Sequence, residues 1–227
     1  MMEYINLGIG KAFIFETNRN GNNSICFKVK IDTKIFFLKL MNYDFDVEFD
    51  CDCMPKLICK GTCIWCEDRY YYRLYEYIDG DILYDLNRLS LEDFKKLIYI
   101  GYRISMNGYS LYDMNAFNFV KRYDGKFFLV DYGAIKKKEE AYSDYICPYV
   151  TNSGLWPDEH KHPKTNNLSE AIEIFYYGQM IKENFETIDK KCIKHIKKMC
   201  EKSPNNRYKK YSEIYSELFN EETQVII

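Results

Sequence analysis

Three polar residues in the middle of the chain have the types and the spacing that phosphoryl transfer requires. They are Asp113, Asn118 and Asp131, and eighteen residues separate the two aspartates. One carboxylate can orient a hydroxyl group and accept its proton, whereas an Asn amide oxygen and a second carboxylate can hold Mg²⁺ against the phosphates of ATP. The surrounding sequence must therefore place a base and two metal ligands at one point.

The local sequence predicts how these residues are brought together. Asp113 and Asn118 lie in a segment too rich in aromatic residues and Asn for a regular helix, which predicts a loop after a helix that ends near Gly108. After Asn118, two short β-prone runs flank an Asp-Gly pair, which is a hairpin signal. The second run leads into Asp131 and Gly133, so we expect the hairpin to return Asp131 to the side of Asn118.

The pattern YDMNAFN followed by LVDYG resembles the catalytic loop and the metal-binding loop of the eukaryotic-type protein kinases. The resemblance makes Asp113 the catalytic base, Asn118 and Asp131 the Mg²⁺ ligands, and Gly133 the last residue of the family's D-F-G triplet. The His, Arg and Lys of the family's catalytic loop are absent, and Tyr112 stands at the place of the Arg. The DYG triplet resembles the casein-kinase and vaccinia-related branch.

The resemblance also assigns an ATP-phosphate loop and a lysine to the first half of the chain. Lys39 is expected on a strand, where it would contact the α- and β-phosphates. Gly8 and Gly10 do not have the family's spacing to this lysine. The loop is instead expected at positions 18–24, with an Asn-Gly hairpin tip as the competing interpretation. Its residues that would offer backbone N–H groups to phosphate are Gly21, Asn22, Asn23 and Ser24.

Two further contacts follow from the same resemblance. Residues Glu76 to Ile78 are expected to face adenine through backbone donors and acceptors. Lys39 is expected to form an ion pair with an acidic residue of the next segment, and Glu48 is the choice. Its competitors are Asp44 and Asp46.

The second half of the chain predicts helices. Positions 90–107 combine an N-cap Ser, an acidic first turn and apolar residues at helical spacing. Positions 136–164 have no periodicity, and the resemblance makes them the activation segment. The segment around Glu173 resembles the family's central helix, with Glu173 in place of the family's Asp. The last segment resembles the family's final helix–turn–helix, and its Arg207 would pair with Glu159. Only thirty-four residues separate Glu173 from Arg207, so we expect the helix between them to be missing or reduced.

Composition and charge limit the class of protein. The 227 residues, 47% hydrophobic and 17% aromatic, are enough for a substantial core in one or two lobes. A formal net charge of -2 disfavours nucleic acid as a partner. We expect no signal peptide and no membrane span, and nine cysteines then indicate reduced thiols in the cytoplasm. Zinc among the cysteines of positions 51–66 is disfavoured, because a strand there would point Cys63 and Cys66 to opposite faces.

Together these patterns predict an α+β protein with a two-lobed protein-kinase-like fold of reduced size. The β-rich N-lobe is expected at positions 1–78 and the helical C-lobe at positions 79–227. The resemblance implies a monomeric cytoplasmic kinase that uses ATP and Mg²⁺ to phosphorylate Ser or Thr of a protein substrate, in the host-cell cytoplasm if the chain is a viral or secreted effector. Two alternatives stay open: a pseudokinase that acts as a binding module, and a small-molecule phosphotransferase.

Position 112 generates a prediction about regulation. In kinases that phosphorylation activates, the Arg at this place binds the phosphate of the activation segment through a bidentate charge-assisted hydrogen bond. The neutral phenol of Tyr112 does not make such a bond. We therefore expect phosphatase-treated protein to keep most of its kinase activity, and Ser143→Ala, Thr151→Ala and Ser153→Ala to change the rate little. A loss of about tenfold, or about 1.4 kcal/mol, in the triple variant with unchanged melting would contradict this expectation.

Overall fold

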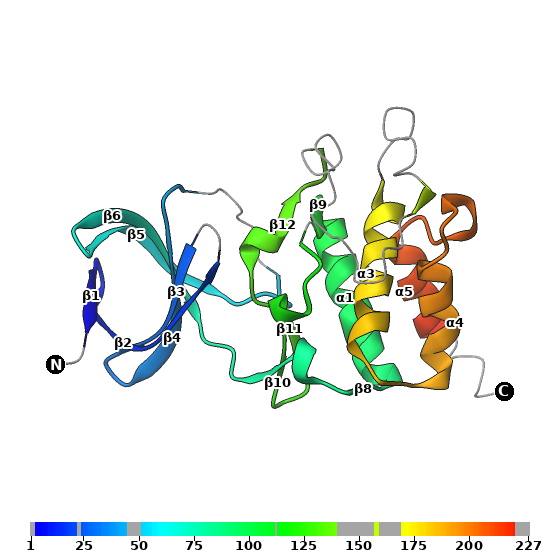
Figure 1. The fold of residues 1–227 in the computed structure, drawn as a ribbon, viewed down its shortest axis with the longest axis horizontal. Coiled ribbons are helices and arrows are strands. Elements are labelled where there is room, and N and C mark those ends of the chain that lie inside the picture. Colours follow the sequence, from blue (N-terminus) through cyan, green and yellow to red (C-terminus); the bar gives the residue numbers. More distant parts are fainter. Residues whose placement is uncertain are drawn as a thin grey trace. The chain divides into compact units, whose positions relative to one another are not determined.

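β-Branched and aromatic runs in the first third of the chain form strands, whereas the apolar-periodic segments near the end form helices. The computed structural model describes positions 3–21, 24–44, 51–111, 113–139, 157–158 and 169–220. The chain divides into two units, Met1–Ile78 and Asp79–Ile227, of which the first is β-rich and the second mainly helical (Figure 1). The predicted α+β class is therefore confirmed.

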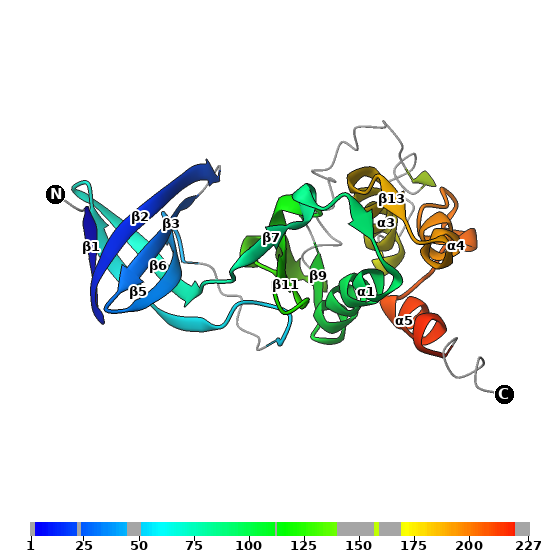
Figure 2. The same ribbon diagram turned by 90° about the horizontal axis from the view of Figure 1, so that it is seen from below.

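One antiparallel sheet forms the first unit. Its strands follow the order β1-β2-β3-β4-β6-β5, and the two views show that the sheet is strongly curled (Figures 1 and 2). The edge strands β1 and β5 approach each other without pairing. The strands are β1 Tyr4–Leu7, β2 Gly10–Gly21, β3 Ser24–Ile31, β4 Lys34–Met41, β5 Leu57–Trp65 and β6 Asp68–Glu76.

Alternating burial along β4 decides which way its lysine points. Leu38 and Leu40 are fully buried in a core that also contains Phe27 and Val29 of β3. Since successive side chains of a strand point to opposite faces, the half-buried Lys39 lies on the other face of the sheet. The predicted strand is therefore present.

The predicted phosphate loop is shorter than the sequence suggested. Strand β2 continues to Gly21, and Ser24 already begins β3, so positions 18–21 belong to a strand rather than to a loop. Asn18 pairs with Cys26 and Gly21 with Ser24, with a register shift between the two pairs. The ladder of antiparallel hydrogen bonds thus overrides the turn preference of this Asn-rich segment. Asn22 and Asn23 lie outside the described residues.

The second unit contains four helices among its described residues. The predicted core helix is present as α1, where Ser90 accepts a hydrogen bond from the Asp93 N–H at 3.1 Å and so caps the first turn. Helix α1 packs against α5, and α3 packs against α4. The Tyr177 hydroxyl of α3 donates to the Leu97 carbonyl of α1 at 2.8 Å. The helices are α1 Leu91–Met106, α3 Glu170–Asn184, α4 Lys190–Met199 and α5 Tyr211–Asn220.

Short elements connect these helices. Around α1 lie β7 Gly80–Ile82, η1 Leu83–Asp85, β8 Arg88–Leu89 and β9 Tyr109–Leu111. Between positions 113 and 139 follow η2 Ala116–Asn118, β10 Phe119–Arg122, β11 Phe127–Leu129, η3 Tyr132–Ala134 and β12 Ile135–Lys137. Near the end lie β13 Thr187–Ile188 and η5 Pro204–Asn206.

The end of the chain has the predicted order of helix, turn and helix. The short 3-10 helix η5 separates α4 from α5, and Arg207 after it is buried, with its guanidinium 5.3 Å from the centre of the Phe175 ring. The expected partner of Arg207, Glu159, lies outside the described residues. Only β13 separates α3 from α4, so no further helix stands between them in this fully described stretch.

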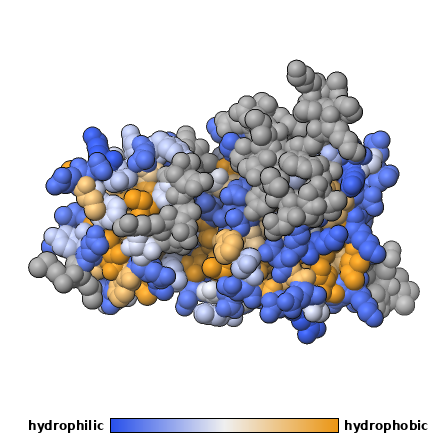
Figure 3. Space-filling view, in the orientation of Figure 1, coloured by the Kyte–Doolittle hydropathy of each residue, from blue (hydrophilic) through white to orange (hydrophobic). Residues whose placement is uncertain are grey.

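Hydrophilic side chains are interspersed with apolar ones over the visible face of the protein (Figure 3). Helix α4 shows the pattern at the level of residues: Cys192, Ile196 and Met199 are buried, whereas most of its lysines are exposed. Within the described ranges, no helix is both long and apolar enough to cross a membrane.

The close approach of α1 and α5 generates a test of the fold. A Cβ added at Gly101 would lie 2.4 Å from Cε1 of Tyr211, whose ring is fully buried. Helix propensity alone would make Gly101→Ala stabilising by about 1 kcal/mol. Because overpacking costs about 1–3 kcal/mol, we expect a net loss of stability in urea unfolding. The loss should disappear in a Tyr211→Leu background, and an equal effect in both backgrounds would contradict the contact.

Candidate functional site

A short strand leads into the loop that carries the predicted base. Strand β9 pairs with β12, with Leu111 opposite Ile135. The Asp113 N–H donates to the Ala134 carbonyl at 3.1 Å, which extends this pairing beyond the strand. Asp113 is therefore held at its backbone, next to the residues that follow Asp131. Tyr112 lies outside the described residues.

Asn118 closes the same loop from its other end. It is the last residue of η2, and its Nδ2 donates to the Asp113 carbonyl at 3.2 Å. Its backbone N–H donates to the Asn115 carbonyl at 2.9 Å. Since the amide nitrogen is used inside the loop, the amide oxygen is the atom that Asn118 can offer to a cation.

The hairpin β10–β11 returns the chain to Asn118. Phe119 pairs with Leu129, and the Val130 N–H donates to the Asn118 carbonyl at 2.8 Å. The turn contains Gly125 at φ +82°, a conformation that glycine adopts without a steric penalty. The structure therefore places the backbone of Asn118 beside the residue that precedes Asp131.

The side chain of Asp131 has a local structural role as well. Its Oδ1 accepts a hydrogen bond from the Gly133 N–H at 2.8 Å and so caps η3. This bond orients the carboxylate relative to the loop that carries it. Asp113, Asn118 and Asp131 are thus carried on two loops that backbone hydrogen bonds tie together, and their oxygens are of the kind that Mg²⁺ prefers.

A buried carboxyl group lies under the first of these loops. Glu173 of α3 is completely buried, and its Oε1 accepts from the Leu111 N–H at 3.0 Å while its Oε2 accepts from the Ser110 hydroxyl at 2.6 Å. Burial raises the pKa of Glu173 from 4.5 to about 8. Glu173 therefore anchors the strand that ends directly before the Asp113 loop.

A second polar cluster lies where the chain leaves the Asp131 loop and β12 ends. Lys138 follows β12, and its Nζ lies 3.0 Å from Glu170 of α3 and 2.8 Å from the Ser105 hydroxyl of α1. Glu170 also accepts from the Tyr211 N–H at 2.6 Å. Residues from α1, α3 and α5 thus meet at the point where the predicted activation segment begins.

Sequence reasoning did not place Glu173, Glu170 or Lys138 at the site. A carboxyl group inside the apolar run of a core helix was the available signal for Glu173, because a buried carboxyl requires hydrogen-bond partners. No comparable signal marked Lys138, which belongs to a run of three lysines.

Two exposed aromatic rings stand beside the metal-ligand candidate. Phe117, directly before Asn118, stacks on Tyr84 of η1 with ring centres 4.4 Å apart. Their exposed fractions are 53% and 56%, so over half of each side chain faces solvent. The site therefore has an apolar, solvent-facing edge within the second unit.

The predicted nucleotide residues of the first unit lie on the sheet. Lys39 pairs with Cys26 of β3 and Arg73 of β6. Cys26 is two residues from the start of β3, so Lys39 lies near the end of the sheet where β2 passes into β3. Gly8 and Gly10 lie at the other end of β2, away from Lys39.

The acidic partner proposed for Lys39 lies beyond the described residues, as does Asp46. Glu48 belongs to positions 45–50, which the structure does not describe. The competing residue Asp44 is engaged with another cation: its Oδ1 lies 3.4 Å from Nη2 of the buried Arg73.

The predicted adenine-facing segment begins with a residue that is already paired. The Glu76 N–H donates to the Lys56 carbonyl at 3.0 Å, and the Glu76 carboxylate accepts from the Lys56 N–H at 3.1 Å. The N–H of Glu76 is therefore engaged inside the first unit, and the adenine contact stays a prediction. Ile78 is buried at the end of the first unit.

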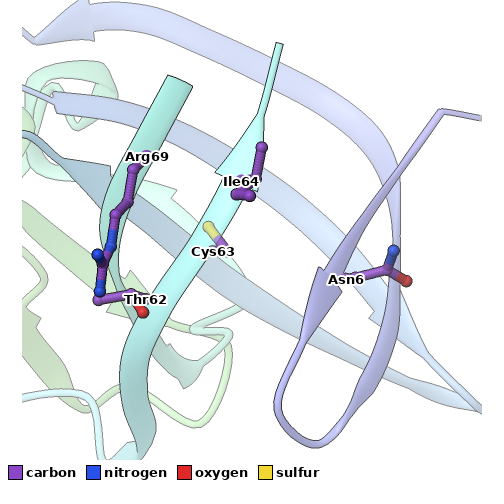
Figure 4. A pocket seen from close by; sticks show the side chains of 5 residues that line it. All are labelled: Asn6, Thr62, Cys63, Ile64 and Arg69. Atoms are coloured by element: carbon purple, nitrogen blue, oxygen red, sulfur yellow. The ribbon is translucent and has the colours of Figure 1, made fainter. Parts of the chain in front are cut away.

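A cavity of about 500 Å³ opens between the edge strands of the first unit (Figure 4). Cys63 is the thiol in its lining, and burial raises the pKa of this thiol to about 11, so it is protonated at neutral pH. None of the predicted site residues lines this cavity. The lining consists of Asn6, Thr62, Cys63, Ile64 and Arg69.

No protein-family profile matches this chain, and no curated protein matches it.

The raised pKa of Glu173 generates a prediction about pH. Because the folded chain binds this proton more tightly than the unfolded chain, the carboxyl favours folding below pH 4.5, and its contribution is lost as pH rises towards 8. Glu173→Gln keeps an acceptor for Leu111 and does not titrate. We therefore expect the variant to gain stability relative to the native chain between about pH 5 and about pH 8, by up to about 1.4 kcal/mol per pH unit.

Urea unfolding at several pH values measures this difference. Glu92→Gln is the matched control, because Glu92 is an exposed residue in the first turn of α1. Parallel stability profiles of the native chain and Glu173→Gln would show that Glu173 is not a buried titrating carboxyl.

Proposed function

We propose that the chain is a compact protein kinase that transfers the γ-phosphate of ATP to a Ser or Thr hydroxyl of a protein, with Mg²⁺. One observation carries the proposal: the loop with Asp113 and Asn118 is joined to the loop with Asp131 by two backbone hydrogen bonds, Asp113 to Ala134 and Val130 to Asn118. A base and two oxygen ligands are thereby gathered from positions up to eighteen residues apart.

Each residue has one role in the proposed reaction. Asp113 orients the acceptor hydroxyl and takes its proton, while Asn118 and Asp131 hold Mg²⁺ through an amide oxygen and a carboxylate. Bound Mg²⁺ would neutralise charge on the phosphates. Lys39 is assigned to the α- and β-phosphates by the resemblance to protein kinases.

Glu173 acts as a positioning residue in this proposal. It binds Ser110 and the Leu111 N–H, which directly precede the Asp113 loop, so it limits the movement of the base. A base that is held at its backbone needs less reordering before reaction, and this favours transfer.

The order of elements at the end of the chain supports a protein kinase over a small-molecule phosphotransferase. The helix, the turn with Pro204 and buried Arg207, and the last helix occur in the order that the protein-kinase resemblance implies. The short β2–β3 connection is the feature that favours the pseudokinase alternative, because little loop is left to cover phosphates.

The proposal predicts that nucleotide binding depends on the charge of Asp131. Asp131→Asn keeps an oxygen for the Gly133 N–H but loses the carboxylate. At a ligand concentration of about 100 times Kd, ATP with Mg²⁺ should stabilise the native chain by about 2.7 kcal/mol. That corresponds to a rise in Tm of roughly 5–10 °C, most of which Asp131→Asn should lose. The control is Asp124→Asn, which removes an exposed carboxylate from the same hairpin.

Transfer of radiolabelled phosphate to a protein mixture tests the reaction itself. Asp113→Asn should lower the rate by about 10²–10⁴-fold without abolishing the nucleotide-induced rise in Tm. A rise in Tm without transfer would identify a pseudokinase, and transfer only to small hydroxyl compounds would identify the other alternative. An equal rise in Tm for the native chain and Asp131→Asn would place the metal elsewhere.

A further inference from the structure

A tight turn before β5 gathers three side chains that bind metal ions. The Met54 N–H donates to the Cys51 carbonyl at 3.0 Å and closes a four-residue turn. The ligand atoms of Cys51, Asp52 and Cys53 all lie within 4.8 Å of one another. The Cys51 Sγ lies 3.9 Å from the Asp52 Oδ1.

These separations are close to those of a tetrahedral zinc site. Zinc–sulfur bonds of about 2.3 Å and zinc–oxygen bonds of about 2.1 Å place ligand atoms about 3.5–3.8 Å apart around the ion. The observed limit exceeds this by about 1 Å. Rotation of side chains can close that difference while the hydrogen bond across the turn is kept.

The exposure of the three residues indicates how they would surround such an ion. The exposed fractions of Cys51 and Cys53 are 4% and 2%, whereas Asp52 is exposed. The sulfurs would therefore hold the ion from the protein side, and the carboxylate would hold it from the solvent side, where the ion enters.

We propose that Cys51, Asp52 and Cys53 form a site for a thiophilic divalent cation of the zinc class. Two thiolates and one carboxylate carry three negative charges, which a divalent cation largely neutralises. Soft sulfur ligands favour Zn²⁺ and disfavour Mg²⁺, whose preferred ligands are oxygens. Three protein ligands leave the fourth position to water, as in open zinc sites. The site uses residues of the first unit, whereas the proposed magnesium ligands Asn118 and Asp131 belong to the second.

The other cysteines nearby do not contribute to this site. Cys59 and Cys63 lie on β5, where Cys63 belongs to the core of the sheet. Cys66 follows that strand at φ 49° and is exposed. The sequence disfavours zinc in this region because a strand would point Cys63 and Cys66 to opposite faces, but β5 ends at Trp65 and Cys66 lies in the turn after it. The proposed site uses neither of them.

Cobalt is a suitable probe, because Co²⁺ in a tetrahedral thiolate site has a charge-transfer band in the near ultraviolet. The full-length chain, stripped of metal by a chelator and kept reduced with a phosphine, would be titrated with Co²⁺. We expect the band to saturate at one Co²⁺ per chain, Zn²⁺ to abolish it, and excess Mg²⁺ to leave it unchanged.

Variants test whether the cobalt charge-transfer band arises from the turn that carries Cys51, Asp52 and Cys53. Cys51→Ser and Cys53→Ser should each weaken Co²⁺ binding at least tenfold, and Cys66→Ser should not change it. Asp52→Asn, a change of an exposed side chain, should also weaken binding and covers the case in which a buried Cys→Ser variant does not fold. Asp131→Asn should leave the band intact.

Three results would overturn the proposal. The first is the absence of a thiolate-to-cobalt band in the native chain. The second is a band that persists in folded Cys51→Ser and Cys53→Ser. The third is an affinity for Co²⁺ that Asp52→Asn leaves unchanged. Any of them would show that the three side chains do not bind the ion together.

Discussion

The hydrogen bonds of one buried carboxyl group determine how the candidate site is held. Glu173 lies in the interior of α3, and it binds the hydroxyl of Ser110 and the N–H of Leu111 on β9. A buried carboxyl without hydrogen-bond partners would be strongly destabilising. Strand β9 must therefore lie against α3 in the position that provides these two hydrogen bonds to Glu173. Burial also raises the pKa of this group, which makes its neutral form the favoured one at neutral pH.

The loops above Glu173 are assembled through their backbones. The bonds from Asp113 to Ala134 and from Val130 to Asn118 do not depend on which side chains stand at these positions. Two side chains of the loops add to this scaffold, because Asn118 Nδ2 donates to the Asp113 carbonyl and Asp131 Oδ1 accepts from the Gly133 N–H. Lys138 and Glu170 then tie the chain that leaves β12 to α1 and α3.

Local patterns were sufficient for much of the fold and for the hairpin beside the candidate site. The run around Lys39 forms the strand that was predicted for it, and Ser90 begins the helix that its capping role predicted. The Asp-Gly pair between two β-prone runs correctly indicated the hairpin before Asp131. Each of these signals depends on residues close together in the sequence, where steric preference and burial period act directly.

The sequence by itself thus determined the α+β class, the strand that carries Lys39, and the hairpin that joins Asn118 to Asp131. Tertiary structure decided the partners: Glu173 lies 62 residues from the Leu111 that it binds, and Asp44 lies 29 residues from Arg73. It also decided that positions 18–21 form strand, because pairing with β3 outweighs the turn preference of an Asn-rich segment. Hydrogen bonds between residues far apart in the sequence leave no local pattern of hydrophobicity or composition. They are therefore seen only in the folded chain.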